Sequence, residues 1–208
     1  MADQFIIRRA TESDAENIYN IHVAAIRSKC STHFSAKDVE IWVARQDKAR
    51  YLPFIQANEI LVAEGGEGKI LGFGHLTRDA KETDGKTMQI RGLFVDPDCG
   101  VKGVGSTLLK ELEKKAKELG GVDTMVVYSS LNAVEFYKKY GFISQGITTH
   151  QMCEPSSLQC HKMIKEFWKL MSSWIQPLSH MGMGYVEVGK ITQVTQVLLI
   201  FVFFEYYY

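Results

Sequence analysis

The spacing of apolar residues in the first fifty positions predicts two helices. Ile18, Ile21 and Ala25 recur at intervals of three and four, which is the helical period. The segment Thr11 to Asp14 before them has the S/T-x-x-D form of a helix start, and Ser35 to Asp38 repeats that form before a second apolar stripe. We therefore expect one helix after Asp14 and another after Ser35.

Short aliphatic runs with the length and composition of strands occupy much of the remaining chain to residue 167. The expected strands cover residues 5–9, 59–64, 70–76, 88–95, 124–129, 142–152 and 159–167. The GGEGK turn between the second and third runs predicts an antiparallel pair. Asp96-Pro97 ends the fourth run, because proline cannot donate a hydrogen bond to a sheet.

Residues 98–120, DCGVKGVGSTLLKELEKKAKELG, join a glycine-rich turn to a strong helix. One helix face is apolar, and its members are Val104, Leu108, Leu109, Leu112, Ala116 and Leu119. Gly120-Gly121 end this helix, and a shorter helix is expected over residues 132–140. The pattern predicts an α+β fold with a strand-turn-helix-strand unit at its centre.

The character of the chain changes after Phe167. Residues 168–208 end in LLIFVFFEYYY, whose apolar run Val197 to Phe204 is far shorter than the about 20 residues that span a bilayer. We expect a domain over residues 1–167 and a C-terminal extension of unassigned role over residues 168–208. A membrane or partner contact by the extension is the alternative.

Charge argues against polyanionic partners. Lys plus Arg and Asp plus Glu each number 24 in the 208 residues, so no basic surplus favours nucleic acid or an anionic membrane. The N-terminus, MADQFIIRRATESDAEN, has no apolar core of a secretory signal. The expectation is a cytoplasmic protein with neither nucleic-acid nor membrane partners.

The four cysteines are few and irregularly spaced, which in a reducing compartment favours free thiols. Two groupings contain metal-ligand residue types: Cys30 with His33, and Cys153 with Cys160 and His161. Neither contains a C-x-x-C pair, so we expect no metal site.

The glycine turn has the composition of an anion site. Glycines before a helix let backbone N–H groups converge on a phosphate, which the helix dipole also favours. The turn lacks the G-K-[ST] of a Walker A loop, and its glycine order is the reverse of the dinucleotide fingerprint. A tight strand-to-helix connection without a ligand is the alternative from the turn alone.

Two segments together resemble the GNAT superfamily of acyl-CoA N-acyltransferases. FVDPDCGVKGVGSTLL resembles its [QR]-x-x-G-x-[GA] signature, and SLNAVEFYKKYGF resembles its N-x-x-A/V-x-x-F-Y-x-x-x-G-F motif. The resemblance covers about residues 5–167. It implies a mixed, mostly antiparallel twisted sheet flanked by helices, and acetyl-CoA as co-substrate without a metal.

The resemblance also implies cofactor-binding positions. The pyrophosphate would bind at the turn, over Gly100, Val101, Lys102, Gly103, Val104, Gly105 and Ser106. The backbone of Leu93, Phe94 and Val95 would pair with the pantetheine arm, and Asn132 and Phe136 would complete the site. Gly92 inside that strand indicates a bulge or a close backbone approach, with a packing kink as the alternative. Gly100 departs from the family pattern, which has Gln or Arg there.

Candidate catalytic residues follow from the same resemblance and from the titratable side chains nearby. Tyr137 is the expected general acid for the departing thiolate, with a core tyrosine as the alternative. Many relatives use a strand glutamate as base, but Gln89 stands in the corresponding stretch. His75 is the preferred base, and His22 or a water relay are alternatives.

The function expected from these residues is acetyl transfer from acetyl-CoA to the primary amine of a small molecule. A protein lysine or N-terminus is a second class of acceptor, and a non-catalytic acyl-CoA-binding module is the rival class. The oligomeric state is open, with a homodimer among the alternatives.

Overall fold

The computed structural model describes residues 5–30, 35–78, 85–153 and 156–167. The extension expected over residues 168–208 lies outside these described residues. The division of the chain after Phe167 therefore stays a prediction.

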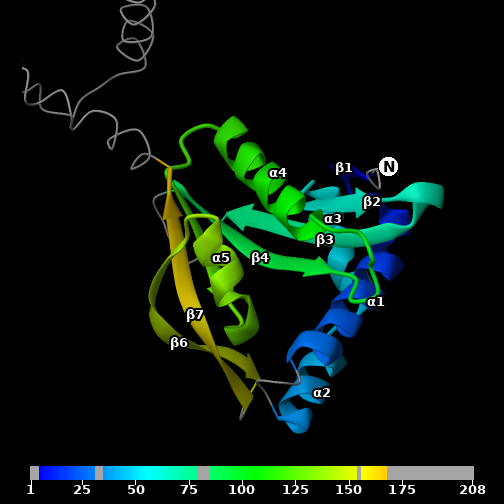
Figure 1. Ribbon diagram of the computed structural model, residues 1–208, viewed down its shortest axis with the longest axis horizontal. Coiled ribbons are helices and arrows are strands. Elements are labelled where there is room, and N and C mark those ends of the chain that lie inside the picture. Colours follow the sequence, from blue (N-terminus) through cyan, green and yellow to red (C-terminus); the bar gives the residue numbers. More distant parts are fainter. Residues whose placement is uncertain (1–4, 31–34, 79–84, 154–155, 168–208) are drawn as a thin grey trace, which may run out of the picture. The chain divides into compact units, whose positions relative to one another are not determined.

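Within the described residues, seven strands form one sheet in the order β1-β2-β3-β4-β5-β7-β6 (Figure 1). The strands are β1 (Ile6–Arg9), β2 (Ile60–Glu64), β3 (Ile70–Arg78), β4 (Thr87–Val95), β5 (Thr124–Ser129), β6 (Ile143–Cys153) and β7 (Ser156–Glu166). All neighbours are antiparallel except β4 and β5, which are parallel and joined by a helix. The predicted α+β, mostly antiparallel sheet with its central strand-turn-helix-strand unit is confirmed.

Helices cover both faces of this sheet. They are α1 (Ala15–Ala25), α2 (Ala36–Ala44), α3 (Leu52–Gln56), α4 (Val104–Glu118) and α5 (Val134–Lys139). Figure 1 shows α4 and α5 on the same face, which we call the α4 face. Buried residues of α1 and α3 pack with Val62 and Phe73 on the opposite face, which we call the α1 face.

The α4 face holds the larger buried cluster, as the helical spacing predicted. Leu108, Leu109 and Leu112 are fully buried against the sheet. Each such leucine contributes about 1.5–3 kcal/mol through burial of its side chain. Leu119 was expected on this stripe but is 51% exposed, because α4 ends at Glu118 and the chain turns away through Gly120.

The two predicted helix starts are confirmed. The Thr11 backbone N–H donates to the Asp14 carboxylate at 2.7 Å, and the same carboxylate accepts from the Arg8 guanidinium. Ser35 caps α2 by accepting from the Asp38 N–H at 3.1 Å. Both contacts satisfy backbone donors that a helix N-terminus leaves without partners.

Candidate active site

The parallel pairing of β4 with β5 covers only the first part of β4. It runs from Thr87 opposite Thr124 to Ile90 opposite Val127 and stops there. Beyond Ile90, β4 still pairs with β3 on its other side, up to Val95 opposite Gly72. The last five residues of β4 therefore have one paired edge and one edge without a strand partner.

A bulge in β4 begins at the same place. His75 of β3 lies opposite Gly92 and Leu76 lies opposite Ile90, so Arg91 is the extra residue. A single extra residue inverts the alternation of a strand. The prediction of a bulge or close approach at Gly92 is confirmed, since the register shifts there.

This inversion decides where the expected pantetheine residues point. Before the bulge, Met88 and Ile90 belong to the α4-face cluster. After it, Leu93 and Val95 pack against that cluster, while Phe94 packs on the α1 face. The backbone of Leu93, Phe94 and Val95 thus forms the edge that lacks a strand partner.

The glycine turn begins where β4 ends. The Asp96 N–H donates to the Leu71 carbonyl at 2.9 Å, and the Asp96 side chain accepts from the Asp98 N–H at 3.0 Å. Gly103 is the residue before α4 and has φ of +87°, a left-handed conformation that favours glycine. Lys102, two residues before α4, is exposed.

The N-terminus of α4 has the properties of an anion site. The first i to i−4 bond of the helix runs from the Thr107 N–H to the Gly103 carbonyl at 2.9 Å. The N–H groups of Val104, Gly105 and Ser106 precede that bond, and the first turn carries no acidic residue. Together with the helix dipole, these groups favour a phosphate.

Gly105 links the turn to two other expected cofactor residues. A Cβ built on Gly105 would lie 3.4 Å from Val95 and 4.0 Å from the Phe136 ring. The structure therefore brings together the start of α4, the end of β4 and the aromatic side chain of α5.

Gly100 does not supply the left-handed conformation of the turn. The left-handed residue in the turn is Gly103, and Gly100 is absent from the residues with positive φ in the described chain. A Cβ on Gly100 would have no heavy atom within 4 Å. The position lacks the family's Gln or Arg, although a Cβ would not clash there.

Asn132 lies in the 3-10 turn Leu131–Ala133 that leads into α5, and its side chain is exposed. Asn132 is not an N-cap, because Ser130 precedes the 3-10 turn and Ala133 precedes α5. The amide is thus not used to cap either helix.

Tyr137 is buried on the α4 face, with 5% of its surface exposed. Its ring packs edge-on against Phe136 at 5.3 Å and Phe142 at 5.4 Å between centroids. Burial raises the pKa of Tyr137 above its usual value, which keeps the phenol protonated at neutral pH. The hydroxyl can donate a proton but cannot accept one from an ammonium.

His75 and His22 lie on the α1 face. The Nε2 of His75 lies 3.0 Å from the Glu59 carboxylate, whose other oxygen accepts from the Thr77 hydroxyl. Desolvation lowers the pKa of His75, although Glu59 opposes that shift. His75 is therefore neutral at pH 7, the state that a general base requires.

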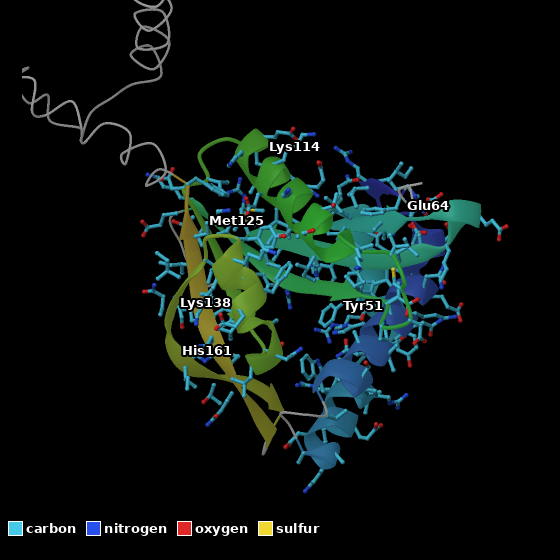
Figure 2. The ribbon with its side chains drawn as sticks, viewed as in Figure 1. Tyr51, Glu64, Lys114, Met125, Lys138 and His161 are labelled. Carbon is cyan, nitrogen blue, oxygen red and sulfur yellow. The ribbon has the colours of Figure 1, made fainter. Side chains whose placement is uncertain are left out.

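His22 is held by Tyr51, which Figure 2 labels. The Nδ1 of His22 lies 2.7 Å from the Tyr51 hydroxyl, and its ring stacks on Phe94 at 4.0 Å between centroids. Its Nε2 is buried and has no hydrogen-bond partner among the described residues. Desolvation, followed by the charges of Arg50 and His75, lowers the pKa of His22 to about 3.

Both imidazoles and the bulge residues line one hollow of about 50 Å³, which we call the histidine hollow. Its lining residues are His22, Gln46, Arg50, Tyr51, Phe54, Phe73, His75, Arg91, Gly92 and Phe94. The structure thus brings His75 and His22 together beside Gly92. Tyr137 is not part of this lining, because it lies on the α4 face.

Several residues in or beside the histidine hollow were not identified from the sequence. Tyr51 and Phe54 come from the 3-10 turn Lys48–Tyr51 and the five-residue α3, which are too short to show a period. Glu59 was assigned to a strand, and only the register places it beside His75. Pro53 in the first turn of α3 was the available signal of that helix.

The residue types considered as metal ligands do not gather in the described part of the chain. No group of three or more His, Cys, Asp or Glu residues there could hold a metal ion. The buried Cys160 thiol donates to the Thr148 carbonyl at 3.7 Å, and the Nδ1 of His161 lies 2.9 Å from the Ser144 hydroxyl. His33 and the side chains of Cys30 and Cys153 lie outside the described residues.

The described helices were also compared with the length and polarity of a membrane span. None of them combines the length and the apolar character needed to cross a bilayer.

Three comparisons relate this arrangement to known proteins. Residues 16–142 match the model of the acetyltransferase (GNAT) family. The uncharacterized N-acetyltransferase YafP of Escherichia coli K12 is 29% identical over 136 residues, which are 65% of this chain and 79% of YafP.

Two solved structures share the fold. A GCN5-related N-acetyltransferase from Rhodopseudomonas palustris has a TM-score of 0.68 and 26% identity, covering 80% of this chain and 98% of its own. The PaiA N-acetyltransferase from Thermoplasma acidophilum, in complex with coenzyme A, has a TM-score of 0.64 and 24% identity, covering 79% of this chain and 99% of its own.

Proposed function

Because the chain belongs to the acetyltransferase (GNAT) family, we propose that it transfers an acetyl group from acetyl-CoA to the primary amine of a small molecule. The family membership and the acetyltransferase class agree with the resemblance found in the sequence. The small-molecule acceptor and the residue roles below are our proposal.

The observation that carries the proposal is the edge of β4 without a strand partner, which leads to the N-terminus of α4. Beyond Ile90, the backbone of β4 can pair with the two amides of a pantetheine arm as it would with a strand. The N–H groups at the start of α4 lie next to the end of this edge, where Gly105 approaches Val95. An extended amide arm attached to a pyrophosphate fits that order of groups.

The PaiA structure supports the choice of co-substrate, since that protein holds coenzyme A on the same fold. The side chains present here fit the same molecule. Phe136 offers an apolar ring beside the turn, and the exposed amide of Asn132 can bond to polar groups of the cofactor.

In the proposed reaction, the neutral amine attacks the thioester carbonyl carbon, and the carbon–sulfur bond breaks. Tyr137 donates its phenolic proton to the departing thiolate, which its burial in protonated form permits. The excess proton of the amine passes to His75, which Glu59 orients through Nε2. Water can relay that proton in place of His75, whereas His22, whose pKa is about 3, is too weak a base for this role.

Two measurements on the full chain test this function. Isothermal titration with acetyl-CoA should show micromolar binding, which corresponds to about 8 kcal/mol. Release of free CoA should then depend on an added amine from a panel of small primary amines. A folded protein that binds no acetyl-CoA would overturn the proposal.

A non-catalytic acyl-CoA-binding module is the second candidate. Two observations favour it, namely Gly100 in the turn and Gln89 in place of a strand glutamate. Substituting Tyr137→Phe separates the two functions, because it removes only the hydroxyl. We expect unchanged acetyl-CoA affinity and a roughly 10²-fold lower turnover, within the range for a general acid. Unchanged turnover would remove Tyr137 from the mechanism.

The remaining expectations belong to this proposal. We assign the catalytic domain to residues 1–167, leave residues 168–208 as an extension, and place the protein in the cytoplasm. These assignments rest on the composition of the sequence.

A further inference from the structure

Two arginines line the histidine hollow without a carboxylate partner among the described residues. Arg50 and Arg91 are both exposed and come from different elements, the 3-10 turn before α3 and the β4 bulge. Two other arginines do have carboxylate partners, since Arg8 pairs with Asp14 and Arg27 pairs with Glu40. The hollow therefore has two cationic groups that no described carboxylate neutralises.

Neutral contacts hold both guanidinium groups in place. Arg91 lies over the Phe54 ring at 5.4 Å, and Phe54 in turn stacks on His75 at 4.5 Å. Arg50 donates to the Gln46 side chain at 3.4 Å. Such contacts orient a guanidinium and leave most of its N–H groups free for a ligand.

The rest of the lining carries no negative charge. It consists of two imidazoles, the Gln46 amide, the Tyr51 phenol, aromatic rings and Gly92. The Glu59 carboxylate beside His75 is not in the lining and accepts hydrogen bonds from His75 and Thr77. An anionic group at the hollow thus meets attraction from two sides and repulsion from none of the lining residues.

We propose that the acceptor is a small amine that also carries a carboxylate, with Arg50 and Arg91 binding the carboxylate at the histidine hollow. This inference rests on the function proposed above. Guanidinium groups match carboxylates through paired N–H donors, which makes arginine the residue suited to this recognition. Among such acceptors we choose an α-amino acid, because its amine and carboxylate are attached to one carbon and the pair suits a hollow of about 50 Å³.

The positive charges of Arg50 and Arg91 also affect the protonation state of the acceptor amine. Two guanidinium groups disfavour an ammonium beside them, so the amine is favoured in its neutral, nucleophilic form. The two charges already act on the imidazoles, because Arg50 contributes to the lowered pKa of His22 and both arginines to that of His75.

The test measures kcat/KM of the full chain for the twenty common L-amino acids at saturating acetyl-CoA, followed by free CoA release. The best amino acid is then compared with its carboxamide, which keeps the amine and the side chain but loses the charge. We expect the acid to be preferred at least tenfold at a pH above the pKa of both amines.

Three variants assign the preference to the residues. Arg50→Gln and Arg91→Gln should each lower kcat/KM for the acid at least tenfold, mainly through KM, and change the value for the amide less than twofold. Arg91→Lys should recover only part of the loss. Arg45→Gln is the matched control, since Arg45 is exposed, lies five positions from Arg50 and is not in the lining, and it should behave as wild type.

The outcomes separate the two proposals. Acetylation of amides or of uncharged amines as fast as of acids, with acetyl-CoA binding intact, overturns the carboxylate inference and leaves the acetyltransferase function standing. Equal losses for acid and amide in the arginine variants overturn it as well. Absence of acetyl-CoA binding by the folded chain overturns both.

Discussion

At the scale of single residues, Gly100 and Gly103 of the turn have different backbone conformations, which the sequence pattern does not distinguish. Gly103 has the left-handed φ of +87° that the turn requires, whereas Gly100 has an ordinary backbone and free space around its Cα. One glycine is required by the backbone, and the other is replaceable. The two positions therefore predict opposite responses to substitution.

We expect Gly100→Arg to bind coenzyme A roughly three- to tenfold more tightly, a change of about 0.7–1.4 kcal/mol. The Cβ of the new side chain would have no heavy atom within 4 Å, and its guanidinium would be able to bond to a phosphate at the α4 N-terminus. Isothermal titration of both proteins with CoA measures the difference.

Gly103→Ala is the matched control for that experiment. It should lower the free energy of unfolding by about 1–2 kcal/mol, because alanine is strained in the left-handed region. If Gly100→Arg weakens CoA binding instead, the phosphate does not bind beside this position.

The buried imidazole of His22 makes stability depend on pH. Its pKa is about 3 in the folded protein and near 6.5 when exposed, so the unfolded chain binds an additional proton between these values. The stability contribution of the neutral ring is therefore complete above pH 6.5 and is lost as the pH falls toward 3. The expected slope is about 1.4 kcal/mol per pH unit.

His22→Gln should remove that slope, since glutamine does not titrate. Urea unfolding of both proteins between pH 8 and pH 4 measures it. At pH 8 the difference reflects packing alone and serves as the internal reference. Parallel curves down to pH 4 would contradict the lowered pKa.

At the scale of elements, the helices and strands could largely be predicted from the sequence. The face of the sheet on which each strand residue lies could be predicted less well. The strand period, the S/T-x-x-D starts and the heptad-like stripe of α4 are local signals, and each confirmed element rests on one of them. The bulge at Arg91 depends on pairing with β3, which is fixed by residues distant in sequence. For that reason the sides on which Leu93 and Phe94 lie could not be predicted.

The candidate site shows the same division. Gly103, Gly105 and Phe136 were predictable because motifs place them a fixed distance apart. Arg50 and Glu59 were missed, since tertiary packing alone brings them to the two histidines or to the hollow. Tyr137 was predicted as an acid, and the structure adds that it lies on the face opposite to His75.

Deleting Arg91 should unfold the protein or reduce its stability by more than 4 kcal/mol. Without the extra residue, Leu93 and Val95 would leave the α4 face, and Phe94 would be turned toward it. Circular dichroism during thermal unfolding measures the loss. Arg91→Gln keeps the chain length and should melt within a few degrees of wild type, and equal melting of the deletion would contradict the role of the bulge.

At the scale of the whole molecule, all seven strands of the described sheet precede Phe167. The last strand, β7, pairs on both sides, with β5 and β6, and the Phe167 N–H donates to the Asp123 carbonyl at 2.9 Å. The buried clusters of both faces are built from residues up to Met163, with Phe167 packed against one of them.

A chain ending at Phe167 should therefore fold and bind acetyl-CoA as the full chain does. Thermal melting and isothermal titration of the two proteins provide the comparison, with agreement expected within about 3 °C and within twofold in Kd. Insoluble or molten protein would place part of residues 168–208 within the domain.

The half-paired strand β4 has a consequence for the exchange of its amide hydrogens with solvent. Amides that are bonded to a neighbouring strand exchange slowly, and amides at an edge without a strand partner exchange quickly. Beyond Ile90, alternate amides of this central strand lie on the edge that has no strand partner. Their hydrogens should therefore exchange as fast as those of a strand at the outer edge of a sheet. Deuterium uptake between Arg91 and Val95 should fall when acetyl-CoA is added, whereas uptake in the fully paired part of β3 should not. Deuterium uptake in β4 would then show whether acetyl-CoA is bound, with no need for an acceptor or for acetyl transfer.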